Sequence, residues 1–360
     1  MLSLSDPLML PRGPVWRNRL ALAPLTNLQS APDGTLLDDE FNWLTMRARG
    51  GFGHVMTCAA HVRPDGQGFP GQLGIWDDRH VPGLSRLAAA LREAGAASAV
   101  QLQHSGYRAD PALTGLPRIA PFDEPESGAT ALTTAGVEQV REDFIAAATR
   151  AEAAGFDGVE LHAAHGYLLC AFLDADRNQR SDRYGGSLAN RARLLFEIAD
   201  GIRSRCRPDF QLGLRLSPER FGVALAEAKA LAADILMDGR FDWLDLSLWD
   251  IMKEPVEPAF AGTRLIDQFA SLPRGGCRLG VAGRILGAPR AREALDAGAD
   301  FVLIGRGAIL HHDWAARAIA DPSFEARPTP VSREALAAEG LGPAFIDYMA
   351  SWKGFVAEAA

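Results

Sequence analysis

The sequence predicts an α/β protein built on a (βα)8 (TIM) barrel, with residues 1–360 forming a single domain. Short runs rich in Val, Leu and Ile recur along the chain, segments with helical spacing separate them, and no shift in composition divides the chain. Parallel strands buried between crossover helices have this pattern. The eight expected strands are residues 20–23, 54–59, 99–103, 158–162, 211–216, 243–248, 278–282 and 301–304.

Three connecting segments can be described further from their residues. Apolar side chains at steps of three and four predict one helix over 188–202. A second helix is expected over 137–154, where Gly155 follows as a C-terminal cap. Residues 105–134 hold several Pro, Gly and Ser, so we expect a long excursion after the third strand that overhangs the active-site face.

Composition narrows the class of protein. With 48% hydrophobic and 23% charged residues the chain can bury a large core. A formal net charge of −8 without a basic run argues against nucleic-acid and membrane-surface partners. The four cysteines form no CxxC pair, so no metal site is predicted, and a reduced, cytoplasmic setting fits. We find neither a signal-peptide pattern nor a membrane span.

A phosphate site is expected after the last two strands. Gly283 and Arg284 follow the seventh strand, and Gly305 and Arg306 follow the eighth. Loops at these two places form the usual phosphate site of a (βα)8 barrel, because glycine lets the backbone approach the anion and arginine adds charge. Either pair alone could be an ordinary glycine-rich turn. Their repetition favours the anion site.

His162, His165 and Tyr167 lie around the end of the fourth strand. A turn there could aim both imidazoles into the barrel mouth, where two N–H donors can grip one substrate oxygen. Structural histidines, or a metal pair completed by Glu160 or Asp174, are the alternatives. Tyr167 can donate a phenolic proton or pack at the rim.

Two further polar residues are expected near the mouth. Gln101 can offer a donor and an acceptor to a flat heterocycle, or it can be a satisfied core amide. Arg215 can face an electron-rich ligand, or it can pair with a buried Asp or Glu. The residues alone do not choose between these interpretations.

Long stretches of the chain resemble the Old Yellow Enzyme, or NADH:flavin oxidoreductase, family of FMN barrels, in order and at the expected strands. The matching stretches include NRLALAPLTN at 18–27, LGIWDDRHVPGL at 73–84, VQLQHSG at 100–106, GFDGVELHAAHGYLLCAFLDADRNQRSDRYGGSLANR at 155–191, and the closing FIDYMASWKGFV. Some family members carry a cysteine where this chain has Thr26, so the chain departs from the pattern of that thiol-tuned subgroup.

The resemblance implies a non-covalently bound FMN contacted by Ala23, Pro24, Leu25, Thr26, Ala59, Gln101, Arg215, Gly283, Arg284, Gly305 and Arg306. It implies that NADH or NADPH reduces the flavin, which then passes a hydride to a small-molecule activated alkene. His162 and His165 would polarise the carbonyl or nitro oxygen, and Tyr167 would deliver the proton. The choice between NADH and NADPH, the alkene and the presence of a homo-oligomer stay open.

Two other functions remain as alternatives. A flavin barrel that resembles tRNA-dihydrouridine synthases would need a basic docking surface, which the acidic charge balance disfavours. A non-redox phosphate-binding barrel, such as an isomerase or aldolase, would need other catalytic groups at the strand ends. No lysine lies immediately at a strand end for a Schiff base, with Lys253 the closest.

Overall fold

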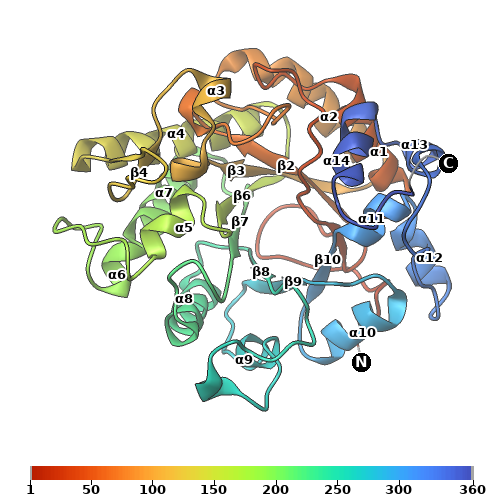
Figure 1. Ribbon diagram of the computed structural model, residues 1–360. Helices are drawn as coiled ribbons and strands as arrows, with labels where there is room; N and C mark the ends of the chain where they lie inside the picture. The colour runs from red at the N-terminus through yellow and green to blue at the C-terminus, as the bar shows by residue number, and fades with distance from the viewer. Residues whose placement is uncertain (1, 358–360) are drawn as a thin grey trace.

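A closed barrel of eight parallel strands organises the computed structural model, which describes residues 2–357 (Figure 1). The strands are β1 (Leu20–Leu22), β2 (His54–His61), β3 (Ala97–Gln103), β6 (Gly158–Ala163), β7 (Gln211–Leu216), β8 (Trp243–Ser247), β9 (Arg278–Ala282) and β10 (Phe301–Ile304). They pair in chain order, and β10 closes the barrel on β1. The predicted (βα)8 barrel is confirmed, with each strand within two residues of its expected bounds. Whether the whole chain is one domain stays a prediction.

Helices surround the barrel in the connections between its strands and in the segment after β10 (Figure 1). They are α1 (Asp38–Arg49), α2 (Val81–Glu93), α3 (Pro111–Thr114), α4 (Thr134–Ala153), α5 (Leu168–Leu173), α6 (Leu188–Arg191), α7 (Arg193–Arg205), α8 (Leu225–Asp238), α9 (Asp267–Ala270), α10 (Ala288–Asp296), α11 (Arg306–Leu310), α12 (Trp314–Ala320), α13 (Arg333–Ala338) and α14 (Pro343–Ala350). Within residues 2–357, none of these helices has both the length and the apolar character needed to cross a membrane.

The two helices expected from periodicity are present with changed bounds. The first is divided at Ala192, because the N–H of Leu195 bonds the Ala192 carbonyl three residues back and tightens that turn. The second, α4, begins earlier than expected because the Thr133 hydroxyl caps the N–H of Gly136. Gly155 follows α4 with φ +92°, which glycine adopts without strain, so the predicted cap residue is confirmed.

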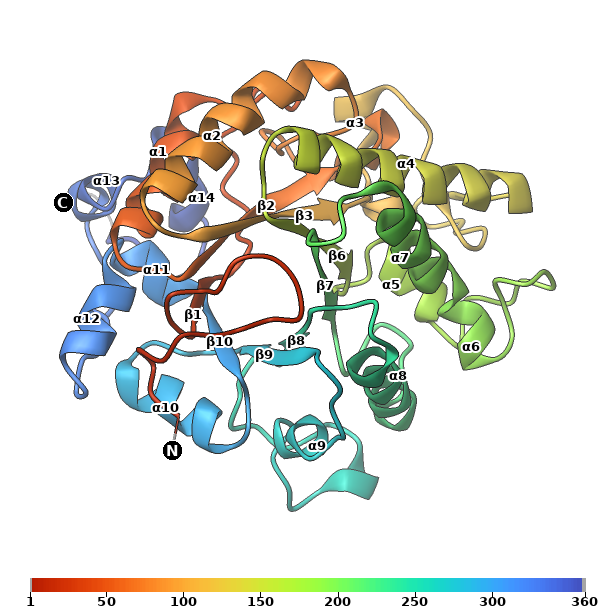
Figure 2. The ribbon, with the colours of Figure 1, turned by 180° about the vertical axis from the view of Figure 1, so that it is seen from behind.

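The N-terminal segment crosses the barrel end where the strands begin (Figure 2). It folds back through an antiparallel bridge between Leu8 and Trp16, and the Trp16 indole enters the barrel. The indole stacks on His54 with ring centroids 4.1 Å apart and meets the rings of Trp243 and Phe301 edge-on. All four rings are fully buried, so this end of the barrel is filled with side chains.

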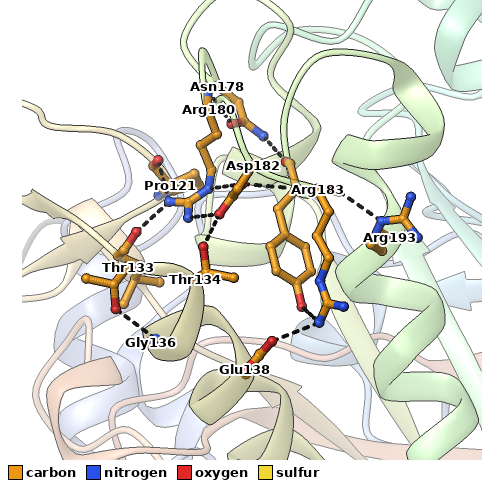
Figure 3. A network of polar contacts seen from close by, with 12 residues as sticks. Pro121, Thr133, Thr134, Gly136, Glu138, Asn178, Arg180, Asp182, Arg183 and Arg193 are labelled. Carbon is orange, nitrogen blue, oxygen red and sulfur yellow. Dashed lines mark hydrogen bonds and ion pairs between the residues drawn. The ribbon is translucent and has the colours of Figure 1, made fainter.

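The excursion over residues 105–134 contains structure of its own: η3 (Gly106–Arg108), α3, β4 (Ile119–Ala120) and β5 (Thr130–Ala131). A polar network ties it to the loop after α5 (Figure 3). Arg180 donates to the carbonyl of Pro121 at 3.2 Å and pairs with Asp182, whose carboxylate accepts from the Thr134 hydroxyl at 2.7 Å. The charged residues of this loop therefore anchor the excursion.

The four buried rings of Trp16, His54, Trp243 and Phe301 form an aromatic plug at this end of the barrel. Replacing Trp16 with alanine tests how much the plug stabilises the fold. We expect Trp16→Ala to lower the free energy of unfolding by about 3–5 kcal/mol, because it removes a fully buried indole and leaves a cavity. The measurement is urea unfolding followed by circular dichroism. Val15→Ala is the control, since Val15 is 51% exposed. Equal stability of the two variants would show that the plug contributes little.

Candidate functional site

A cavity of about 520 Å³ opens at the carboxyl ends of the strands. Every site residue expected from the sequence lines it: Ala23, Pro24, Leu25, Thr26, Ala59, Gln101, His162, His165, Tyr167, Arg215, Gly283, Arg284, Gly305 and Arg306. The volume is in the range of ordinary cofactor and substrate pockets. The structure thus brings together groups that lie far apart in the chain.

Residues other than glycine adopt left-handed backbone only in the loops around this cavity, among the residues that the structure describes. Among residues 2–357, the non-glycine residues with positive φ are Leu28, His165, Arg220, Phe221, Trp249 and Arg284. Each lies in a loop that follows a barrel strand. Such backbone costs free energy and gathers at functional sites, where the surrounding structure maintains it.

The turn expected after the fourth strand exists at His165, with φ +60°, and at Gly166, with φ +74°. It aims both imidazoles into the cavity, where Nδ1 of His165 lies 3.3 Å from Nε2 of His162. Nε2 of His165 lies 2.8 Å from the hydroxyl of Ser247, at the end of β8. The Ser217 hydroxyl accepts from the backbone N–H of His165 at 3.0 Å. Serines at the carboxyl ends of two neighbouring strands, one just after β7 and one at the end of β8, therefore position His165.

Tyr167 precedes α5 and lies beside the histidines. Its ring centroid is 5.2 Å from that of His162, and the guanidinium of Arg108 lies 5.5 Å from its ring centre. Burial raises the pKa of Tyr167, which keeps the phenol protonated at neutral pH. Arg108 comes from the excursion and also donates to the carbonyl of His165 at 2.6 Å. The excursion thus braces this turn.

Both histidines carry strongly shifted protonation equilibria. Burial, with help from the charge of Arg215, lowers the pKa of His165 to about 3. Burial lowers the pKa of His162 well below its usual value, and the neighbouring His165 and Arg215 add to the shift. Both rings are therefore neutral at neutral pH, and each presents one N–H donor and one acceptor nitrogen.

Gln101 forms part of a buried layer across β3, β6 and β8. Its Nε2 donates to Oε1 of Glu160 at 2.8 Å, and the Trp243 indole N–H donates to Oε2 of Glu160 at 2.8 Å. The indole can reach Glu160 because Gly213 lies between them, where a Cβ atom would clash with the ring. Gln101 is thus a core amide that also lines the cavity.

Arg215 pairs with a buried acid and lines the cavity as well. Its Nε lies 3.2 Å from Oδ2 of Asp245, which is the neighbouring residue on β8 in the strand register. The angle is too poor for a hydrogen bond, so among residues 2–357 the Arg215 Nε and both Asp245 oxygens have no hydrogen-bond partner. The fork of Arg215 is held by charge and left available to a ligand.

The two Gly-Arg pairs occupy another part of the cavity wall. A Cβ atom on Gly305 would meet only Leu25 Cδ2, at 3.6 Å, so a ligand could approach this backbone closely. Gly283 instead packs on the backbone of Asp250, 3.0 Å from where its Cβ would lie. The Arg284 side chain is 63% exposed and lies 3.5 Å from the Asp250 carboxylate. Charge for an anion would come from Arg284 and Arg306.

The alternative of a metal pair is not supported. Glu160 turns both oxygens to Gln101 and Trp243. Asp174 accepts from the backbone N–H groups of Asp176 and Arg177 in its own loop. No group of three or more metal-binding side chains occurs within residues 2–357.

Several cavity residues were not identified from the sequence: Phe69, Ser247, Trp249, Tyr348, Met349 and Trp352. Ser247 is the last residue of β8, so the rule that active-site residues lie at the carboxyl ends of barrel strands could have found it. The last three lie on or just after α14, which packs back over the barrel mouth near α11 (Figure 1). These three residues do not follow the end of a strand, so only the tertiary fold reveals that they lie at the cavity.

The sequence matches a family described as the NADH:flavin oxidoreductase / NADH oxidase family over residues 6–321. It is 34% identical over 322 residues to "Probable NADH-dependent flavin oxidoreductase YqiG" of Bacillus subtilis (strain 168), with 86% of each chain covered. It is 32% identical over 348 residues to the NADH:fumarate oxidoreductase of Klebsiella pneumoniae (strain 342), with 92% of this chain covered. The match spans only 37% of that longer protein.

Solved structures give the same family. The Old Yellow Enzyme homologue from Zymomonas mobilis superposes with a TM-score of 0.80 at 26% identity, covering 96% of this chain and 99% of the other. Morphinone reductase superposes with a TM-score of 0.77 at 27% identity, covering 96% of each chain. The resemblance inferred from sequence stretches is confirmed.

The low pKa values of the cavity histidines predict a loss of stability in acid. An unfolded chain binds a proton on each histidine below about pH 6.5, whereas the folded protein keeps His165 neutral down to about pH 3. Stability is therefore full above pH 6.5 and falls as the pH decreases from there. We expect His165→Asn to reduce this acid sensitivity, as measured by urea unfolding between pH 7.5 and 5. If His165→Asn shows the same pH dependence of stability as wild type, the lowered pKa of His165 is contradicted.

Proposed function

Because the chain belongs to the NADH:flavin oxidoreductase / NADH oxidase family, an Old Yellow Enzyme-like group that uses FMN and NADH or NADPH, we propose that it is an ene-reductase. The proposed substrates are small α,β-unsaturated carbonyl or nitro compounds. The observation that carries the proposal is one cavity in which two neutral imidazoles, a protonated phenol and the residues expected to bind the cofactor converge.

The cavity wall fits a flavin in its chemistry. The Arg215 fork and the Gln101 amide offer donors and an acceptor to the polar edge of a flat heterocycle. The residues Ala23, Pro24, Leu25, Thr26 and Ala59 would contact the ring system. The open side of Gly305 admits a close ligand, and Arg284 and Arg306 would bind the phosphate. Bound FMN supplies hydride transfer between the nicotinamide and the alkene.

His162 and His165 would hold the substrate oxygen between Nε2 and Nδ1, the atoms that face each other at 3.3 Å. When these two nitrogens bond each other, one must donate and the other accept, whereas an oxygen ligand between them needs two donors. A Ser247 hydroxyl that donates to Nε2 of His165 leaves the proton on Nδ1, where the oxygen would bind. Ser247 would therefore select the tautomer that stabilises negative charge on that oxygen.

Tyr167 would donate the proton that completes the reduction. Its raised pKa keeps the phenol protonated, and its place beside His162 would put it near the carbons next to an oxygen bound there. The excursion contributes through Arg108, which braces the turn that carries His165. Thus the chain itself binds the oxygen, orients the alkene and supplies a proton.

Tyr167→Phe tests the assigned proton donor. We expect alkene reduction by the reduced enzyme to slow by roughly 10²-fold or more, because a general acid contributes about that factor. Flavin reduction by NADH or NADPH needs no phenolic proton and should stay within a few-fold of wild type. Stopped-flow absorbance separates the two half-reactions. Tyr184→Phe, which alters a buried tyrosine that does not line the cavity, is the control. Equal slowing of both half-reactions by Tyr167→Phe would refute the assignment.

Arg306→Ala tests whether this arginine binds the phosphate group of FMN. We expect the dissociation constant for FMN to rise about tenfold to a hundredfold, the effect of losing a charged hydrogen bond of about 1.5–3 kcal/mol. The dissociation constant for riboflavin, which lacks the phosphate, should hardly change. Flavin fluorescence on titration of the apoprotein measures both. Arg290→Ala on α10 is the control, because that arginine pairs with Glu293 on its own helix and does not line the cavity.

A further inference from the structure

Two carboxylic acids and one guanidinium lie together inside the barrel below the cavity. Glu160 on β6 and Asp245 on β8 have no exposed surface, and Arg215 on β7 lies between their strands. Glu160 occupies the level of Gln101 in the strand register, and Asp245 occupies the next level with Arg215. A dry interior favours a balance of charge, and one cation balances only one of the two acids.

The other titratable groups around this pair do not change the balance. His162, on β6 with Glu160, is neutral. On β2, burial lowers the pKa of His54 to about 3, so the ring that packs against Trp243 is neutral as well. β3 carries no ionisable side chain, β1 and β10 carry only apolar ones, and Arg278 of β9 donates to the Met9 carbonyl.

We propose that Glu160 and Asp245 are positioning residues that together hold one proton beneath the cofactor site, so that the charge facing Gln101 and Arg215 changes with the protonation of this pair. The inference rests on the proposed flavin site. Neither acid lines the cavity, and each acts through the cavity residue that it touches. The pair would therefore change the midpoint potential of the bound cofactor without touching the substrate.

The direction of the effect follows from burial and charge. Burial and the charge of Asp245 raise the pKa of Glu160 to about 8, while burial raises the pKa of Asp245 less strongly because Arg215 opposes it. At pH 7 Glu160 holds the proton and Asp245 balances Arg215. Above pH 8 Glu160 loses its proton and adds a second negative charge. Electrons placed on a ligand beside Arg215 disfavour that charge, so reduction should draw a proton from solvent onto a Glu160 oxygen.

The test is the midpoint potential of the bound flavin in the holoenzyme between pH 6 and 10, measured by spectroelectrochemistry. Two electrons enter the flavin from the electrode, and each proton coupled to them adds about 30 mV per pH unit to the slope. We expect the wild-type slope to steepen above pH 8 by up to one such step relative to E160Q, whose amide cannot ionise. In D245N, Glu160 becomes the partner of Arg215, so the steeper region should move to lower pH.

The matched control is E40Q, which removes another fully buried carboxyl, bonded to Asn27 and Ser30 and away from Arg215. Its potential should follow the wild-type curve at every pH. If the plots of midpoint potential against pH are parallel for wild type, E160Q and D245N, the inference is overturned, even if a variant shifts the potential by a constant amount. Purified protein without bound flavin, or a flavin that neither NADH nor NADPH reduces, would instead contradict the proposed function.

Discussion

Closure of the barrel by the parallel pairing of β1 with β10 is the constraint on which the site depends. The register places Leu20 opposite Val302 and Leu22 opposite Ile304, so the first and last strands of the barrel run in the same direction. Because all eight strands are parallel, all of their carboxyl ends lie on one rim. Residues separated by nearly three hundred positions, such as Thr26 and Arg306, can therefore line one cavity.

The two ends of the barrel interior differ in polarity. Trp16, Trp243 and Phe301 fill the end where the strands begin. Glu160 bonds this aromatic layer through Trp243, and Asp245, Arg215, His162 and His165 lie above it toward the mouth. The aromatic plug closes the barrel to water where the strands begin. An ionised group inside the closed interior therefore costs much solvation free energy. The polar end therefore works with few charges.

Much of the fold and the site could be predicted from the sequence because barrel strands are short apolar runs and their ends carry the polar residues. The same reasoning could not find Tyr348 or Trp352, since no strand leads to them and a helix brings them over the mouth only in the folded chain. Nor could it detect the break at Ala192, which leaves the apolar periodicity intact. Gln101 bonds a core carboxyl and Arg215 pairs with a buried aspartate, as one reading of each residue expected, and both side chains also line the cavity.

One physical cause places the three proposed catalytic groups in a useful protonation state. Burial disfavours charge, so it lowers the pKa of a histidine and raises that of a tyrosine. At His162 and His165 this leaves neutral imidazoles, and at Tyr167 it leaves a phenol with its proton. Arg215 strengthens the effect on the histidines. A cavity more open to water would return all three groups toward their ordinary pKa values, so exclusion of water sets their chemistry together.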